Sequence, residues 1–194
     1  MLLRWAIACV ICLFSATAAL PAHARFAKTV RAELVARFVP AMMHRGLLTA
    51  QEPLEHGKLR GFVVIERDGL PADKAYWFIT NQEYSYRPVI IADDTITTRG
   101  GLAYMFLKRG QVMAVTGIEY SGQTVYLKLL SPEPVVPPGR RERFPSRVAT
   151  MVGFKFPKAV ADGDPAAVLA TIESWVKPFP DRAGAEAYAA PRSP

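Results

Sequence analysis

Apolar and polar residues alternate from Gln111 to Leu130 with the period of two that is typical of a β-strand. The residues expected to share one face of the first strand are Val112, Ala114, Thr116, Ile118 and Tyr120. Val125, Leu127 and Leu129 are expected to share a face of the second strand. Ser121-Gly122 lies between the runs, and a two-residue loop with glycine suits the tight turn of an antiparallel hairpin. Gly117 either marks a bulge in the first strand or merely weakens it.

Shorter strand-like runs, most of them bounded by glycine or proline, lie on both sides of this hairpin. They are Leu59–Glu66, Lys74–Thr80, Val89–Ala92, Leu102–Leu107 and Arg147–Phe156. The second run is expected to pair with the first across a loop that contains Pro71, and Asp93-Asp94 is expected to form a turn. With the hairpin they make about seven strands, and a closed or nearly closed sheet leaves few exposed edges. We therefore expect a small antiparallel β-barrel-like sheet in an α+β domain.

Two segments have the apolar spacing of an amphipathic helix. In residues 29–43 a proline favours an end near Val39, and the mixed charges of the polar face favour packing on the sheet over binding to a membrane surface. In the second segment Asp164-Pro165 supplies an N-cap and a proline at the first helical position, and an apolar stripe follows up to Pro178. The sheet is therefore expected to carry an N-terminal helix and a C-terminal packing helix.

The beginning of the chain has the pattern of a secretory signal peptide. Arg4 precedes an apolar run to Leu20, and Ala22-His23-Ala24 places small residues at the cleavage positions. The run has about sixteen residues, whereas a membrane-spanning helix needs roughly twenty. We expect cleavage after Ala24, a periplasmic or secreted protein, and no transmembrane span in the mature chain; a retained signal anchor is the alternative.

These patterns divide the chain into four expected segments. They are a signal peptide (1–24), an N-terminal helical segment (25–57), a β-rich core with the C-terminal helix (58–178) and a flexible tail (179–194). Both cysteines, Cys9 and Cys12, lie in the expected leader, so the mature chain would contain no thiol and no disulfide.

The formal charge of the whole chain is +7, and +6 remains once Arg4 is removed. Outside the cytoplasm, a moderately basic protein is expected to meet anionic lipid or polysaccharide before nucleic acid, although many exported proteins are simply basic. We expect no nucleic-acid partner.

The segment from Lys108 to Leu130 resembles the central strands of small SH3-like barrels, through its Lys108-Arg109-Gly110 turn and the two alternating strands that follow. This resemblance implies architecture and no activity.

The sequence offers few groups for catalysis. The Gly-x-Ser-x-Gly motif of serine hydrolases is absent, and Ser85 is the serine in the most favourable setting. Carboxylates that the fold could bring together are Glu66, Asp68, Glu83 and Glu119. His44 and His56 lie twelve positions apart without a metal-binding pattern, so we expect no metal and no cofactor.

Two stretches favour binding instead. Tyr84 and Tyr86 would share one face of an extended segment, with Arg87 next to them, and could stack on a sugar ring; alternatively these tyrosines cover a barrel edge. Arg140, Arg141 and Arg143 form the second stretch.

Arg147 follows this second stretch, and together these arginines could bind phosphate or carboxylate groups; alternatively they belong to a solvated loop. The sequence therefore favours a binding or structural module of the cell envelope, with an envelope protein, a polysaccharide or an anionic lipid as partner. A metal-independent hydrolase that uses carboxylates or Ser85 is the alternative.

Overall fold

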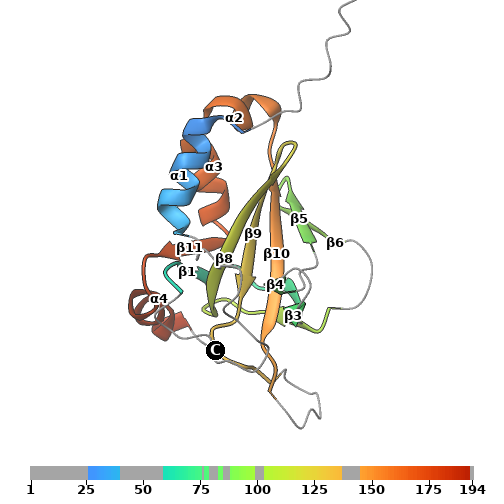
Figure 1. Cartoon of the computed structure of the whole chain (residues 1–194), viewed down its shortest axis with the longest axis vertical. Helices are drawn as coiled ribbons and strands as arrows, with labels where there is room; N and C mark the ends of the chain where they lie inside the picture. The colour runs from blue at the N-terminus through green and yellow to red at the C-terminus, as the bar shows by residue number, and fades with distance from the viewer. Residues whose placement is uncertain are drawn as a thin grey trace, which may run out of the picture.

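The computed structural model describes residues 26–39, 59–75, 77–78, 83–84, 88–98, 103–136 and 145–192 (Figure 1). The strands are β1 (Phe62–Ile65), β2 (Leu70–Lys74), β3 (Trp77–Phe78), β4 (Glu83–Tyr84), β5 (Pro88–Ala92), β6 (Thr95–Thr98), β7 (Met105–Leu107), β8 (Val112–Ser121), β9 (Thr124–Leu130), β10 (Val148–Lys155) and β11 (Val176–Phe179). The helices are α1 (Lys28–Phe38), α2 (Lys158–Gly163), α3 (Pro165–Glu173) and α4 (Arg182–Ala189), and a 3-10 turn, η2 (Ala190–Arg192), follows α4.

Nine of these strands form one curled, half-barrel sheet. Its order is β11-β1-β8-β9-β10, and β10 then pairs with β2 at its beginning and with β5 further along. β7 extends the first branch and β6 the second, while β3 and β4 pair separately. The fold is therefore α+β, as expected, but the sheet is mixed because β5 runs parallel to β10. The expectation of a purely antiparallel sheet was wrong, and the resemblance to SH3-like barrels stays a prediction.

Helices cover the two faces of the sheet unequally. The inner face packs on α1, α2 and α3, which lie together on one side of β8 in Figure 1. Val30, Leu34 and Phe38 of α1 are fully buried there, and burial of such side chains contributes about 1.5–3 kcal/mol each. Of the helices that the structure describes, α4 packs on the outer face, at one end of it. The predicted packing of the N-terminal helix on the sheet is confirmed.

Strand β1 is buried on both faces. Val63 and Ile65 belong to the core under α1 and α3, whereas Phe62 and Val64 belong to a second core with Ala185 and Ala189 of α4. A strand covered on both sides reads as a continuous apolar run. β1 pairs with β8 and β11, so the expected hairpin between Leu59–Glu66 and Lys74–Thr80 was wrong.

Pro71 lies in β2 opposite Phe106, and not in a loop. β2 pairs with β10 at Asp73 and Lys74, which follow Pro71 in the strand. A strand edge without a ladder partner at that point tolerates a residue that has no N–H to donate.

The hairpin of β8 and β9 was predicted correctly, with one shift of its turn. Ser121 pairs with Thr124, so the two-residue turn is Gly122-Gln123, and Gly122 has a φ of 58°. A β-bulge lies between Val115 and Gly117, which agrees with the first of the two interpretations of Gly117.

The bulge also corrects the expected faces of β8. Val115 faces the inner core before the bulge, and Ile118 and Tyr120 pack against the same core after it. Val112 and Ala114 lie on the outer face instead. One extra residue moves every later side chain to the opposite face, because the strand period is two.

Three of the four ends of the two predicted helices lie where the sequence predicts them. α1 ends at Val39, and Asp164 caps α3 by accepting a hydrogen bond from the amide of Ala167 at 2.9 Å. The prediction that the second helix continues up to Pro178 was wrong, because residues 176–179 form β11.

The segment expected to be a flexible tail contains α4, whose Ala185 and Ala189 are buried. The expected leader (1–24) lies outside the described residues, so its role stays a prediction. Among the helices that the structure describes, none is long and apolar enough to cross a membrane.

Candidate functional site

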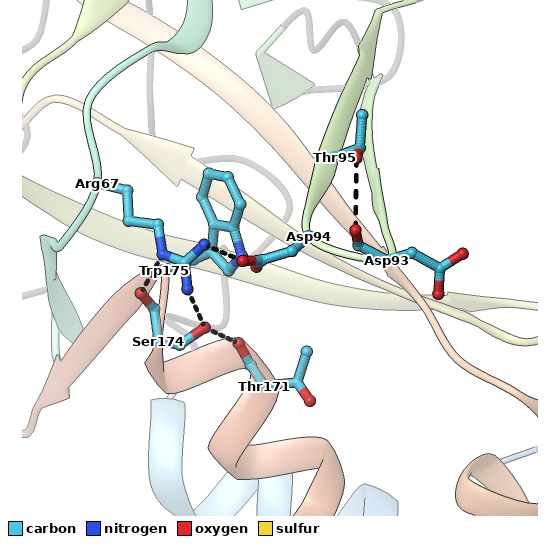
Figure 2. Close-up of polar contacts among 7 residues, drawn as sticks. All are labelled: Arg67, Asp93, Asp94, Thr95, Thr171, Ser174 and Trp175. Atoms are coloured by element: carbon cyan, nitrogen blue, oxygen red, sulfur yellow. Dashed lines mark hydrogen bonds and ion pairs between the residues drawn. The ribbon is translucent and has the colours of Figure 1, made fainter.

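Three turns that are distant in sequence meet at Arg67 (Figure 2). Arg67 follows β1, Asp94 lies in the β5–β6 turn, and Ser174-Trp175 joins α3 to β11. Nη1 of Arg67 donates to Oδ2 of Asp94 at 2.6 Å, and Nε donates to the carbonyl oxygen of Ser174 at 3.1 Å. The guanidinium also stacks on the indole of Trp175, with 4.6 Å between Cζ and the ring centroid. We call Arg67, Asp94 and Trp175 the turn clamp.

Trp175 also contacts Asp94, the third member of the turn clamp. Its Nε1 donates to Oδ1 of Asp94 at 3.1 Å, so both carboxylate oxygens of Asp94 accept a hydrogen bond. Only 4% of Trp175 is exposed, and its ring is therefore not available to stack on a ligand. Asp93 and Asp94 have φ values of 47° and 62°, a left-handed conformation that Asp tolerates and that suits a two-residue hairpin turn.

The electrostatics of the turn clamp indicate a structural role. The hydrogen bond from Arg67 lowers the pKa of Asp94, and the hydrogen bond from Trp175 acts in the same direction. A carboxylate that is held ionised and whose oxygens are both engaged is poorly suited to act as a general acid or base. The predicted Asp93-Asp94 turn is confirmed, and Arg67 and Trp175 were not identified from the sequence.

A different group of side chains crosses the open part of the outer face. Neighbouring strands place Glu119 (β8), Tyr126 (β9), Gly153 (β10), Ile90 (β5) and Thr97 (β6) side by side. We call these five residues the outer row. Neither apolar core includes Tyr126 or Ile90, and both side chains are half-buried.

Gly153 determines how Tyr126 lies in the outer row. A Cβ atom at position 153 would be 2.6 Å from Cε1 of Tyr126 and 2.9 Å from Cδ1 of Ile90. The absence of a side chain therefore lets the tyrosine ring lie across β10 toward Ile90. An aromatic ring above a glycine can be purely structural, because it shields the exposed backbone. The same geometry also leaves a partly exposed aromatic surface close to the sheet.

Polar groups stand at both ends of the outer row. Glu119 is half exposed and forms an ion pair with Lys128 at 2.5 Å, and Thr97 is exposed at the other end. Lys128 lies opposite Met151, in the neighbouring row of the same face. The surface thus combines an aromatic ring, a hydroxyl group and a charge pair that is close to neutral.

Most of the residues predicted to bind a ligand lie outside the described residues. These are Tyr86, Arg87, Arg140, Arg141 and Arg143; Ser85, the candidate nucleophile of the alternative hydrolase, also lies outside the described residues. For Tyr84 the structure gives the backbone, which pairs with Trp77 in the β3–β4 hairpin. The binding roles of these residues stay predictions.

Arg147 is described and makes local contacts. Its Nη1 donates to the carbonyl oxygens of Ser131 (2.8 Å) and Pro132. These bonds tie the end of β9 to the start of β10, next to the hydrogen bond from the Val148 amide to Oγ of Ser131 at 3.0 Å. Arg147 therefore helps to close the base of the loop that precedes it.

The candidate carboxylates are distributed over three places. Arg109 contacts two of them: its Nη2 lies 3.8 Å from Oε2 of Glu66, and its amide donates to Oδ1 of Asp68 at 2.7 Å. Oε1 of Glu66 is buried and has no hydrogen-bond partner among the described residues. Glu119 belongs to the outer row, and Glu83 lies in β4 with only its backbone described.

Tyr126 was not identified as a candidate binding residue from the sequence, because its position over Gly153 depends on the register between two strands. The sequence places Tyr126 on the polar face of its strand, but only the pairing of β9 with β10 puts it opposite Gly153. Among the residues that the structure describes, no group of three or more His, Cys, Asp or Glu side chains could hold a metal ion. No family model matches the chain, and the curated proteins and the solved structures contain no significant match to it.

Proposed function

We propose that this chain is an exported binding module of the cell envelope and that its outer row binds a polysaccharide. The observation that carries the proposal is the position of the Tyr126 ring over Gly153 on a face of the sheet that no described helix covers at this point. Export, cleavage after Ala24 and a periplasmic or secreted location are part of the same proposal, as is the SH3-like architecture.

The chemistry of the outer row suits a sugar better than the other envelope partners. The C–H groups on one face of a pyranose pack against an aromatic ring, and tyrosine joins such a ring to a polar tip. Glu119 and Thr97, at the two ends of the row, supply an acceptor and a hydroxyl group for sugar hydroxyls. A surface for anionic lipid would instead carry an excess of cations, whereas Glu119 here balances Lys128.

The stacking that the sequence predicts for Tyr84 and Tyr86 is extended here to Tyr126. Arg87 directly precedes Pro88, the first residue of β5, and Pro88 lies opposite Met151. Tyr84, Tyr86 and Arg87 therefore remain candidates for a continuation of the same binding surface. Arg140, Arg141 and Arg143 remain candidates for contacts with anionic groups of the polymer.

Sedimentation with purified peptidoglycan sacculi tests the proposal. We expect the wild-type protein to sediment with the sacculi and Tyr126→Ala to lose most of this binding. Phe106→Ala is the matched control, because Phe106 is an aromatic residue of β7 that is 57% exposed and lies outside the outer row. Equal sedimentation of Tyr126→Ala and the wild type would exclude the outer row, and binding only to phosphatidylglycerol vesicles would favour the lipid partner.

A metal-independent hydrolase is the second candidate, and it is favoured by Oε1 of Glu66, which is buried, lies two positions from Asp68 and has no hydrogen-bond partner in the described part of the chain. Hydrolysis of a glycosidic bond uses two carboxyl groups that flank the bond, and Asp68 is the candidate for the second one. Release of soluble sugar fragments from sacculi by the wild type, and its loss in Glu66→Gln, would support this function. Binding without fragment release would support the binding module.

A further inference from the structure

Two polar groups that have no hydrogen-bond partner among the described residues meet where α1 contacts β8. Nε of Arg31 and the phenol oxygen of Tyr120 are both buried, and neither forms a hydrogen bond with any described residue. They belong to the same contact, because Cζ of Arg31 lies 4.7 Å from the centroid of the Tyr120 ring. Buried polar groups are nearly always hydrogen-bonded, so two unsatisfied groups in contact need an explanation.

Aromatic rings lie next to Tyr120. The ring of Phe26 lies 5.8 Å from that of Tyr120 and 6.1 Å from that of Phe156, between centroids. Phe26 and Phe156 are themselves buried. In such apolar surroundings a hydrogen bond to a guanidinium is stronger than in water, and a missing one costs more.

The charge around Arg31 favours an anion. Arg31 forms no ion pair with a described carboxylate: Asp162 of the adjoining helix α2 pairs with Lys158, and Glu119 pairs with Lys128. Lys28 lies one helical turn before Arg31 and is exposed. The positive charge of this corner is therefore uncompensated by the described acidic side chains.

The donors define the chemistry of the ligand. A guanidinium N–H only donates, and a phenol can donate as well as accept. Burial raises the pKa of Tyr120, which keeps the phenol protonated and able to donate at neutral pH. One oxygen-rich anion can thus accept from both groups, and guanidinium binds phosphate especially well.

We propose that Arg31 and Tyr120 form a binding site for a phosphate group. The site is separate from the outer row, because Tyr120 packs on the inner core and Tyr126 lies on the opposite face of the sheet. The phosphate can be a free anion or part of a lipid headgroup, and both are recognised by the same donors.

Thermal unfolding of the purified protein in inorganic phosphate, compared with chloride at equal ionic strength, tests the site. A ligand of the folded state raises the unfolding temperature with its concentration, so we expect phosphate to stabilise the wild type. Arg31→Lys keeps the positive charge but removes the Nε–H donor of the guanidinium. It should weaken the apparent affinity for phosphate about tenfold, which corresponds to the loss of one charge-assisted hydrogen bond. Tyr120→Phe removes only the hydroxyl and should weaken it by a smaller factor.

Arg37→Lys is the matched control on the same helix, because Arg37 is exposed and pairs with Glu173. Its phosphate response should equal that of the wild type. The proposal is overturned if phosphate has no effect beyond that of chloride, or if Arg31→Lys and Tyr120→Phe both respond like the wild type. Binding to phosphatidylglycerol vesicles that Arg31→Lys weakens would assign the phosphate to a lipid, and a phosphate response without vesicle binding would assign it to a free anion.

Discussion

Trp175 donates a hydrogen bond from its indole nitrogen to the carboxylate of Asp94, 3.1 Å away and 81 positions earlier in the chain. The bond joins the β5–β6 turn to the corner where α3 ends and β11 begins. β5 and β6 are attached to the rest of the sheet through β10, in a parallel pair. The turn clamp therefore gives the β5–β6 branch a second attachment, and it holds the strands that carry Ile90 and Thr97 of the outer row.

Asp94→Asn should lower the thermal unfolding temperature more than Asp93→Asn. Asn tolerates the left-handed conformation of both positions, so the backbone is preserved in both variants. Only Asp94 loses an ion pair with Arg67, since the turn clamp does not use the side chain of Asp93. Circular dichroism melts at pH 7 provide the comparison, and equal melting temperatures would show that the clamp does not stabilise the fold.

Acid should destabilise the contact between α1 and α3. The hydrogen bond from Arg37 lowers the pKa of Glu173 below its ordinary value of 4.5, and Lys177 lowers it further. A lowered pKa in the folded state means that the stabilisation is present above pH 4.5 and is lost as the pH falls through the folded-state pKa.

Glu173→Gln should therefore be less stable than the wild type at pH 7 and should approach it as the pH is lowered toward 2. Urea unfolding at several pH values measures the difference. Glu33→Gln on the exposed side of α1 is the control, and its difference from the wild type should not follow this curve.

The sequence was informative where local pattern and tertiary structure agree. The alternation of Val125, Leu127 and Leu129 survives in β9 because one face of this strand contacts the inner core. The stripe through Trp175 and Val176 was misread because helical spacing of apolar residues does not show where the helix stops. Val176 lies in β11 opposite Ile65, a pairing across 111 positions that no local signal contains.

The candidate sites depend even more on long-range register. Tyr126 and Gly153 meet through the pairing of β9 with β10, and Arg31 meets Tyr120 only after the bulge at Gly117 has turned Tyr120 inward. A strict period of two also keeps Tyr120 and Val112 on one face, whereas the structure places them on opposite faces. The bulge could be expected from Gly117, but its effect on the later side chains requires the observed register.

Gly61→Ala should be strongly destabilising. A Cβ atom at this position would lie 2.1 Å from the carbonyl oxygen of Phe38 and 2.4 Å from that of Val39, and backbone atoms at a helix end cannot move aside cheaply. We expect a loss of about 3 kcal/mol or more in the free energy of unfolding, measured by urea titration. Gly117→Ala is the control, because its Cβ would meet only the side chain of Lys128 at an ordinary 3.5 Å. Similar losses in both variants would contradict the close approach of α1 to Gly61.

Gly153→Ala tests whether the glycine is needed for the position of Tyr126. The new Cβ would lie 2.6 Å from the Tyr126 ring, so the ring must leave its place over β10. Both close contacts are with ends of side chains, and we therefore expect a moderate loss of about 1–2 kcal/mol in stability. Binding to sacculi should fall nearly as far as in Tyr126→Ala, although the tyrosine is still present.

The double variant separates a clash with the ring from a general effect of alanine in β10. In a Tyr126→Ala background the added Cβ meets only Ile90, so Gly153→Ala should cost about 1 kcal/mol less than in the wild type. Urea unfolding of the four proteins gives this coupling energy. Additive losses would mean that Tyr126 does not lie over Gly153 in solution, and the outer row would then lose the flat aromatic surface on which sugar binding depends.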